Sequence, residues 1–154
     1  MKKAFTMIEL IFVIVILGIL SGVAISKMVV TRDDAIISKG RSEVAAIRNA
    51  ISLKRNSNIL MGKGASYPSR LDALGSATSN EGDPLFDYDT NSSDSSAQLL
   101  DYAIYAKSEN GWRKVATNKY TFNAIGQDIN FTYTPSNGNF DCTHTVQLCK
   151  DLTE

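Results

Sequence analysis

The chain has 154 residues with 16 basic and 16 acidic side chains, so its formal net charge is +0. This length allows one modest domain. The charge balance lacks the basic footprint that is typical of nucleic-acid-binding domains, so we expect no nucleic-acid partner. Hydrophobic residues make up 44% of the chain, and many of them lie near the N-terminus. Composition therefore predicts an apolar N-terminal segment followed by a single domain.

The apolar segment begins close to the N-terminus. Residues 10–26 carry no charge, and most of them are Ile, Leu or Val. A helix over residues 5–26 would be roughly 33 Å long, which is enough to cross the apolar core of a bilayer. Lys2 and Lys3 precede it and favour a cytoplasmic N-terminus by the positive-inside rule. We therefore expect residues 5–30 to be transmembrane and residues 31–154 to lie in the periplasm.

One short motif joins the two lysines to the apolar run, and it reads Lys-Lys-Ala-Phe-Thr-Met-Ile-Glu-Leu. It resembles the leader and first helix of type IV filament proteins, the type IV pilins and the pseudopilins of type II secretion. The resemblance implies that prepilin peptidase removes residues 1–4 by cleaving between Ala4 and Phe5, and that the new Phe5 amine is N-methylated. Glycine is usual before the cleavage site, so Ala4 is a departure that we expect to slow processing slightly.

Glu9 occupies the place of the glutamate that is most diagnostic of this family. A carboxylate in hydrocarbon costs on the order of 2.5–3.5 kcal/mol on insertion scales, so it needs a partner. Cleavage creates one, because an α-amino group with a pKa of about 7.7–8 is largely cationic at neutral pH. Pairing of Glu9 with the Phe5 amine of a neighbouring subunit would set the filament register, since an unpaired buried charge penalises wrong registers.

The helical pattern continues past Ser26 as far as about Asn56 but becomes amphipathic. Apolar or small residues recur there at spacings of three and four, at Ile37, Gly40, Val44, Ile47 and Ile51. Such a stripe is typical of a helix that packs on a domain core. Relatives often carry a proline where this chain has Ser26, so the sequence does not decide whether the helix stays continuous.

The last third of the chain is predicted to be β-structure. Residues 112–116 form one expected strand, and apolar and polar residues alternate over residues 120–124 and 129–133. Turns are expected at residues 125–127 and 135–138, and the Asn-Gly pair in the second is a strong hairpin signal. The predicted fold is α+β and pilin-like, with a long N-terminal helix packed by its second half against a C-terminal antiparallel sheet.

The two cysteines, Cys142 and Cys149, are close in sequence near the C-terminus. An exported compartment allows a disulfide between them, and a C-terminal bridge also resembles many pilins. No Cys-x-x-Cys occurs and His144 is the only histidine, so we expect no metal site of that kind, no cofactor and no enzymatic activity.

A polar loop over residues 75–98 follows a short helical segment expected around Leu71 and Leu74. It contains acidic and amide side chains that could hold calcium: Asp83, Asp87, Asp89, Asn91 and Asp94. The spacing departs from the EF-hand pattern, since Ser92 and Gln98 replace its glycine and glutamate. Major pseudopilins resemble one another in binding calcium in such a loop, but a solvated acidic loop is the simpler interpretation.

The resemblance implies a structural function as an inner-membrane subunit of a type II secretion pseudopilus. It also implies a set of partners: other copies of the chain, other pseudopilins, prepilin peptidase, an inner-membrane platform protein and an assembly ATPase. The nearest alternative is a type IV pilin or minor pilin for DNA uptake, adhesion or motility. A third is a soluble periplasmic binding protein, because Gly22-Val23-Ala24 also fits a secretory cleavage site, which would give a mature start at Ile25.

Overall fold

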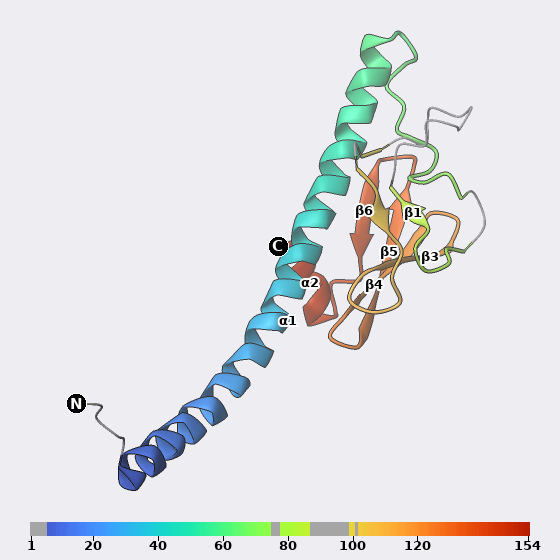
Figure 1. Ribbon diagram of the computed structural model, residues 1–154. Helices are drawn as coiled ribbons and strands as arrows, with labels where there is room; N and C mark the ends of the chain where they lie inside the picture. Colours follow the sequence, from blue (N-terminus) through green and yellow to red (C-terminus); the bar gives the residue numbers. More distant parts are fainter. Residues whose placement is uncertain (1–5, 75–77, 87–98, 101) are drawn as a thin grey trace. The chain divides into compact units, whose positions relative to one another are not determined.

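A computed structural model describes residues 6–74, 78–86, 99–100 and 102–154 of the chain, without the side chains of residues 24–31. The chain divides into two compact units, Met1–Ala35 and Ile36–Glu154. Helix α1, Met7–Leu60, belongs to both units (Figure 1). Its N-terminal part lies in the first unit, and its C-terminal part is the first element of the second unit. The α+β, pilin-like arrangement predicted from the sequence is confirmed, since the second half of α1 packs on an antiparallel sheet.

Helix α1 has 54 residues and runs without a break through Ser26. Its C-terminus is closed by Gly62, whose φ of 73° is the left-handed conformation that glycine adopts at little cost. The Gly62 N–H donates to the Ile59 carbonyl at 3.0 Å, and the Lys63 N–H donates to the Asn58 carbonyl at 2.9 Å. This is a Schellman motif, and it places the end of the helix four residues beyond the expected Asn56.

The expected transmembrane character of the first half of α1 is not supported by the structure. Within the part of the chain that the structure describes, no helix combines the length and the apolar character needed to cross a bilayer.

The second unit contains a four-stranded antiparallel sheet in the order β3-β4-β5-β6. Its strands are β3 Trp112–Ala116, β4 Lys119–Ala124, β5 Gln127–Thr134 and β6 Asn139–Cys142. The predicted antiparallel sheet and the position of its first strand are therefore confirmed. A separate two-stranded ribbon pairs β1 Pro84–Leu85 with β2 Ile104–Tyr105.

The β4–β5 hairpin turns through Ile125 and Gly126, which have φ values of 53° and 73°. Two positive φ values at the centre of a two-residue loop define a type I′ turn, which matches the twist of the flanking strands. Gly126 suits this turn, whereas a β-branched residue such as Ile125 adopts a positive φ only with strain.

The core of the second unit forms where α1 meets the inner face of the sheet. The predicted stripe faces inward, because Val44, Ile47 and Ile51 are at most 1% exposed. The sheet and the segment before it contribute buried aromatic rings, namely Phe86, Trp112, Tyr120, Phe122, Phe131, Tyr133 and Phe140. Ring centroids such as those of Trp112 and Phe131 lie 5.0 Å apart, so the rings form one cluster of edge and stacked contacts.

Two local expectations were incomplete. Residues 71–74 form no helix, because the Asp72 carboxylate turns inward and accepts the Leu74 N–H at 2.8 Å.

A short C-terminal helix, α2 Gln147–Thr153, was not predicted. Its buried residues are Leu148, Cys149 and Leu152, a spacing of one and four that is helical in principle. Seven residues are too few for that pattern to stand out from the adjoining turn.

Candidate functional site

The N-terminal motif is the first part of the candidate site. Ala4 and Phe5, the expected cleavage pair, lie outside the described residues, so the cleavage and methylation assigned to them remain predictions. The described chain starts at Thr6, one residue before α1 begins. Glu9 lies in the first turn of the helix, where a negative charge is stabilised by the helix dipole.

Thr6 and Glu9 form a reciprocal capping box at the start of α1. The Thr6 backbone N–H and hydroxyl both donate to Glu9 Oε2 at 2.9 Å. In return, the Glu9 backbone N–H donates to Thr6 Oγ1 at 3.3 Å. This arrangement satisfies N–H groups that have no partner within the helix. The sequence signal for this capping box is Thr-x-x-Glu. The box was not predicted from the sequence, because Glu9 was assigned only a role in the filament.

The helix surface after the capping box is apolar on every side. The large apolar side chains from Met7 to Val23 are all exposed, from 40% at Ile16 to 79% at Met7. A helix that is hydrophobic all round is normally buried, either in lipid or inside a larger protein assembly. An apolar environment of this kind is therefore expected around residues 7–23.

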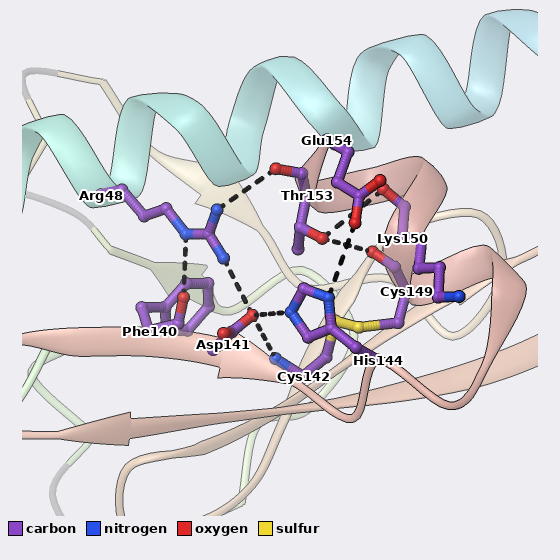
Figure 2. Close-up of a disulfide and its surroundings, with 9 residues drawn as sticks. All are labelled: Arg48, Phe140, Asp141, Cys142, His144, Cys149, Lys150, Thr153 and Glu154. Carbon is purple, nitrogen blue, oxygen red and sulfur yellow. Dashed lines mark hydrogen bonds and ion pairs between the residues drawn. A yellow bond between two sulfur atoms is a disulfide. The ribbon is translucent and has the colours of Figure 1, made fainter.

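The second part of the candidate site surrounds the C-terminal disulfide (Figure 2). A bond joins Cys142 at the end of β6 to Cys149 in α2, with Cα atoms 6.0 Å apart. This pairing is the one favoured from the sequence. Because Cys149 is fully buried, the disulfide holds α2 against the core.

Arg48 of α1 links three segments around this disulfide. Its guanidinium donates to the Phe140 carbonyl at 3.0 Å, to Asp141 Oδ1 at 2.9 Å and to the Thr153 carbonyl at 3.5 Å. Arg41 similarly donates to the Asp151 carbonyl at 2.7 Å. Both arginines thus supply donors to carbonyls in the last turn of α2, where a cation also favours the helix dipole. Sequence reasoning did not identify this role, because nothing local to either arginine signals a partner about a hundred residues away.

Gly40 makes the close approach of α1 to α2 possible. A Cβ atom at this position would lie 2.6 Å from the Phe122 ring and 2.7 Å from the Leu152 side chain. Phe122 and Leu152 are fully buried, so neither has free space to move into. The glycine in the predicted stripe is therefore a contact point for both the sheet and α2.

Glu43 of α1 lies beside this core, in contact with Trp112. Its carboxylate accepts the Trp112 indole N–H at 3.0 Å and lies 3.6 Å from the Lys39 ammonium. Burial raises the pKa of Glu43 above its usual value, and the Lys39 charge only partly opposes that shift.

His144 does not form a convincing metal site. Its Nε2 lies 3.0 Å from Asp141 Oδ1, and ligand atoms of Asp141, His144 and Cys149 lie within 4.8 Å of one another. However, the Cys149 sulfur is bonded to Cys142 and so is not available as a thiolate ligand. The remaining pair of groups is an exposed hydrogen bond beside the disulfide.

The candidate calcium loop stays a prediction. Of its five proposed ligands only Asp83 lies in the described residues, and its carboxylate accepts the Asn80 N–H at 2.7 Å. Asp87, Asp89, Asn91 and Asp94 lie outside them, so the calcium site is not tested by the structure.

Comparison with known proteins bears on the N-terminal motif. Residues 1–25 match the family model described as the prokaryotic N-terminal methylation motif. No curated protein and no solved structure matches the chain. The matched stretch contains the expected cleavage pair, the Thr6–Glu9 capping box and the exposed apolar segment from Met7 to Val23. The match supports a prepilin-processed protein of the type IV pilin-like family.

Proposed function

We propose that this chain is a structural subunit of a type II secretion pseudopilus. The observation that carries the proposal is the methylation-motif match over residues 1–25, followed by an exposed apolar helix. The short chain and the small four-stranded sheet favour a pseudopilin over a type IV pilin. The activity is assembly, with no chemistry of its own.

In this proposal the N-terminal part of α1 is covered twice in succession. Before assembly, the inner membrane surrounds it, with the N-terminus cytoplasmic and the C-terminal domain periplasmic. After prepilin peptidase has cut between Ala4 and Phe5, the helices of neighbouring copies cover one another in the filament. An assembly ATPase and an inner-membrane platform protein drive the transfer between these environments, and other pseudopilins join the same filament.

Glu9 sets the register in this scheme. The capping box keeps its carboxylate at the first turn of α1, four positions along the sequence from the residue that becomes the new N-terminus. A Phe5 amine from the neighbouring subunit would then meet a carboxylate that is already oriented. Because a wrong register would leave both charges unpaired in an apolar environment, it is disfavoured by several kcal/mol, in the range of about 3–5 measured for broken buried pairs.

The proposal is tested by the mature N-terminus and by two substitutions at Glu9. Intact mass and N-terminal sequencing of protein from native membranes should give a start at methylated Phe5. Glu9→Ala should be cleaved normally but should yield at least tenfold fewer filaments. Glu9→Gln is the matched control, since glutamine also serves in a capping box but carries no charge. If Glu9→Gln assembles like wild type, the charge pairing has no role in register.

The alternatives give different results in the same experiments. A mature start at Ile25 would overturn the filament proposal in favour of a secreted soluble protein. A start at Phe5 together with surface filaments, and with secretion unaffected by deletion of the protein, would favour a type IV pilin.

A further inference from the structure

Among the described residues of the second unit is a fully buried pair of opposite charges that the proposed function does not use. Lys114 of β3 and Asp72, from the segment after α1, have side chains that are 0% exposed. Lys114 Nζ lies 2.5 Å from Asp72 Oδ1. The two groups are therefore in direct charge-assisted contact.

The Asp72 carboxyl group is held by two further donors. The Tyr120 hydroxyl, also buried, donates to Asp72 Oδ2, and the Leu74 backbone N–H donates to Oδ1 at 2.8 Å. Burial, followed by the neighbouring Asp72 charge, raises the pKa of Tyr120 above its usual value. Its hydroxyl therefore keeps its proton and remains a donor. The Phe86 ring lies 4.7 Å from the Tyr120 ring, so the group is bordered by the aromatic core.

This environment favours the loss of both charges. Removing an ammonium and a carboxylate from water costs several kcal/mol for each ion, and their attraction often fails to offset that cost. Condensation to an amide removes both charges at once and leaves only neutral groups in the core. We propose that Lys114 and Asp72 are a modification site, at which the folded chain forms an intramolecular isopeptide bond between Lys114 Nζ and Asp72 Cγ.

The reaction needs only the atoms already in contact. One proton moves from Nζ to Asp72 Oδ1, which gives a neutral amine and a neutral acid. The Nζ lone pair then attacks Cγ, and the Tyr120 hydroxyl stabilises the negative charge that develops on Oδ2. A second proton passes from nitrogen to Oδ1, the Cγ–Oδ1 bond breaks, and water leaves. The third proton stays on the amide nitrogen, Oδ2 becomes the amide carbonyl, and no oxidant or cofactor is required.

Fixed geometry takes the place of a separate catalyst in this scheme. Lys114 Nζ and the Asp72 carboxyl oxygen are held in contact by elements far apart in sequence, and well-oriented intramolecular reactions gain effective molarities as high as about 10⁵–10⁸ M. The bond would join the segment after α1 to strand β3 across a sequence separation of 42. It would thus crosslink the first part of the domain, as the Cys142–Cys149 disulfide crosslinks the last.

The mass of the full-length protein tests the proposal without any dependence on assembly. After reduction of the disulfide, wild-type protein extracted from membranes should be lighter by one water molecule than its sequence and N-terminal processing require. Proteolysis and fragmentation should give one branched peptide that links position 72 to position 114. Lys114→Met, which lacks the nucleophile, should show the full mass and no branched peptide.

Two further variants separate this chemistry from other losses of water. Asp72→Asn would form the same amide by losing ammonia, so its linked product should have the wild-type mass. Tyr120→Phe, which removes the donor to Oδ2, should raise the unlinked fraction at least tenfold. Wild-type protein at its full mass would show an ion pair only and would overturn the proposal, and so would a water loss that maps to other residues.

Discussion

Substitution of Gly40 by alanine is a sensitive test of how closely α1 approaches the rest of its domain. Alanine in a helix interior is favoured over glycine by about 0.8–1.0 kcal/mol, so propensity alone predicts a more stable protein. The structure predicts the opposite sign, because the added Cβ would lie 2.6–2.7 Å from the Phe122 and Leu152 side chains. Overpacking of a filled core typically costs about 1–3 kcal/mol. We therefore expect Gly40→Ala to lower the free energy of unfolding by up to about 2 kcal/mol.

The assay can use the chain's own fluorescence. Trp112 is the single tryptophan and is fully buried beside Phe122, so its emission reports the core during chemical denaturation of the detergent-solubilised chain. Ala45→Gly, at an exposed position one turn further along α1, measures the propensity difference without any packing change. If Gly40→Ala stabilises the domain by as much as Ala45→Gly destabilises it, α1 does not approach Phe122 and Leu152 closely at Gly40, and this prediction is refuted.

Two further substitutions test the β4–β5 turn and the partly buried acid Glu43. Ile125→Asn should stabilise the domain by about 1 kcal/mol, because asparagine tolerates a positive φ that costs other residues roughly 1–2 kcal/mol. Denaturation midpoints measure this gain, with Val115→Asn at an exposed strand position as the control. A midpoint for Ile125→Asn no higher than that of Val115→Asn would contradict the prediction. Glu43 has a raised pKa in the folded state, so the folded chain holds that proton more tightly than the unfolded chain does. Its contribution to stability should therefore fall as pH rises from about 4 towards 7. Relative to wild type, Glu43→Gln should become more stable over that range, and a change in the opposite direction would refute the assigned shift.

Most of the fold could be predicted because its signals are local and repeated. The stripe from Gly40 to Ile51 has a helical period, and the strands around Phe122 and Phe131 alternate with a period of two. Each signal recurs several times, so an error at one position does not change the assignment. The turn residues between the strands mark where each strand ends, which the alternating pattern alone does not show.

The interactions that hold the domain together were less predictable. Arg48 contacts β6 and α2 across more than ninety positions, and Lys114 meets Asp72 across 42. Charged residues on a helix or an edge strand are usually solvated, so composition gives no reason to bury any of them. These pairings follow from the three-dimensional arrangement of the elements, which a single sequence does not reveal.

The N-terminal site, in contrast, is more evident from the sequence than from the structure. Its residues are adjacent, so the motif carries most of the information, and the structure adds one physical detail. Thr6 and Glu9 cap α1 within a single chain, so the carboxylate is oriented before any neighbour arrives. Pre-orientation of a group lowers the entropy lost when its partner binds. The same glutamate can therefore stabilise the helix start in the free subunit and, in the proposed filament, select the register of the next subunit.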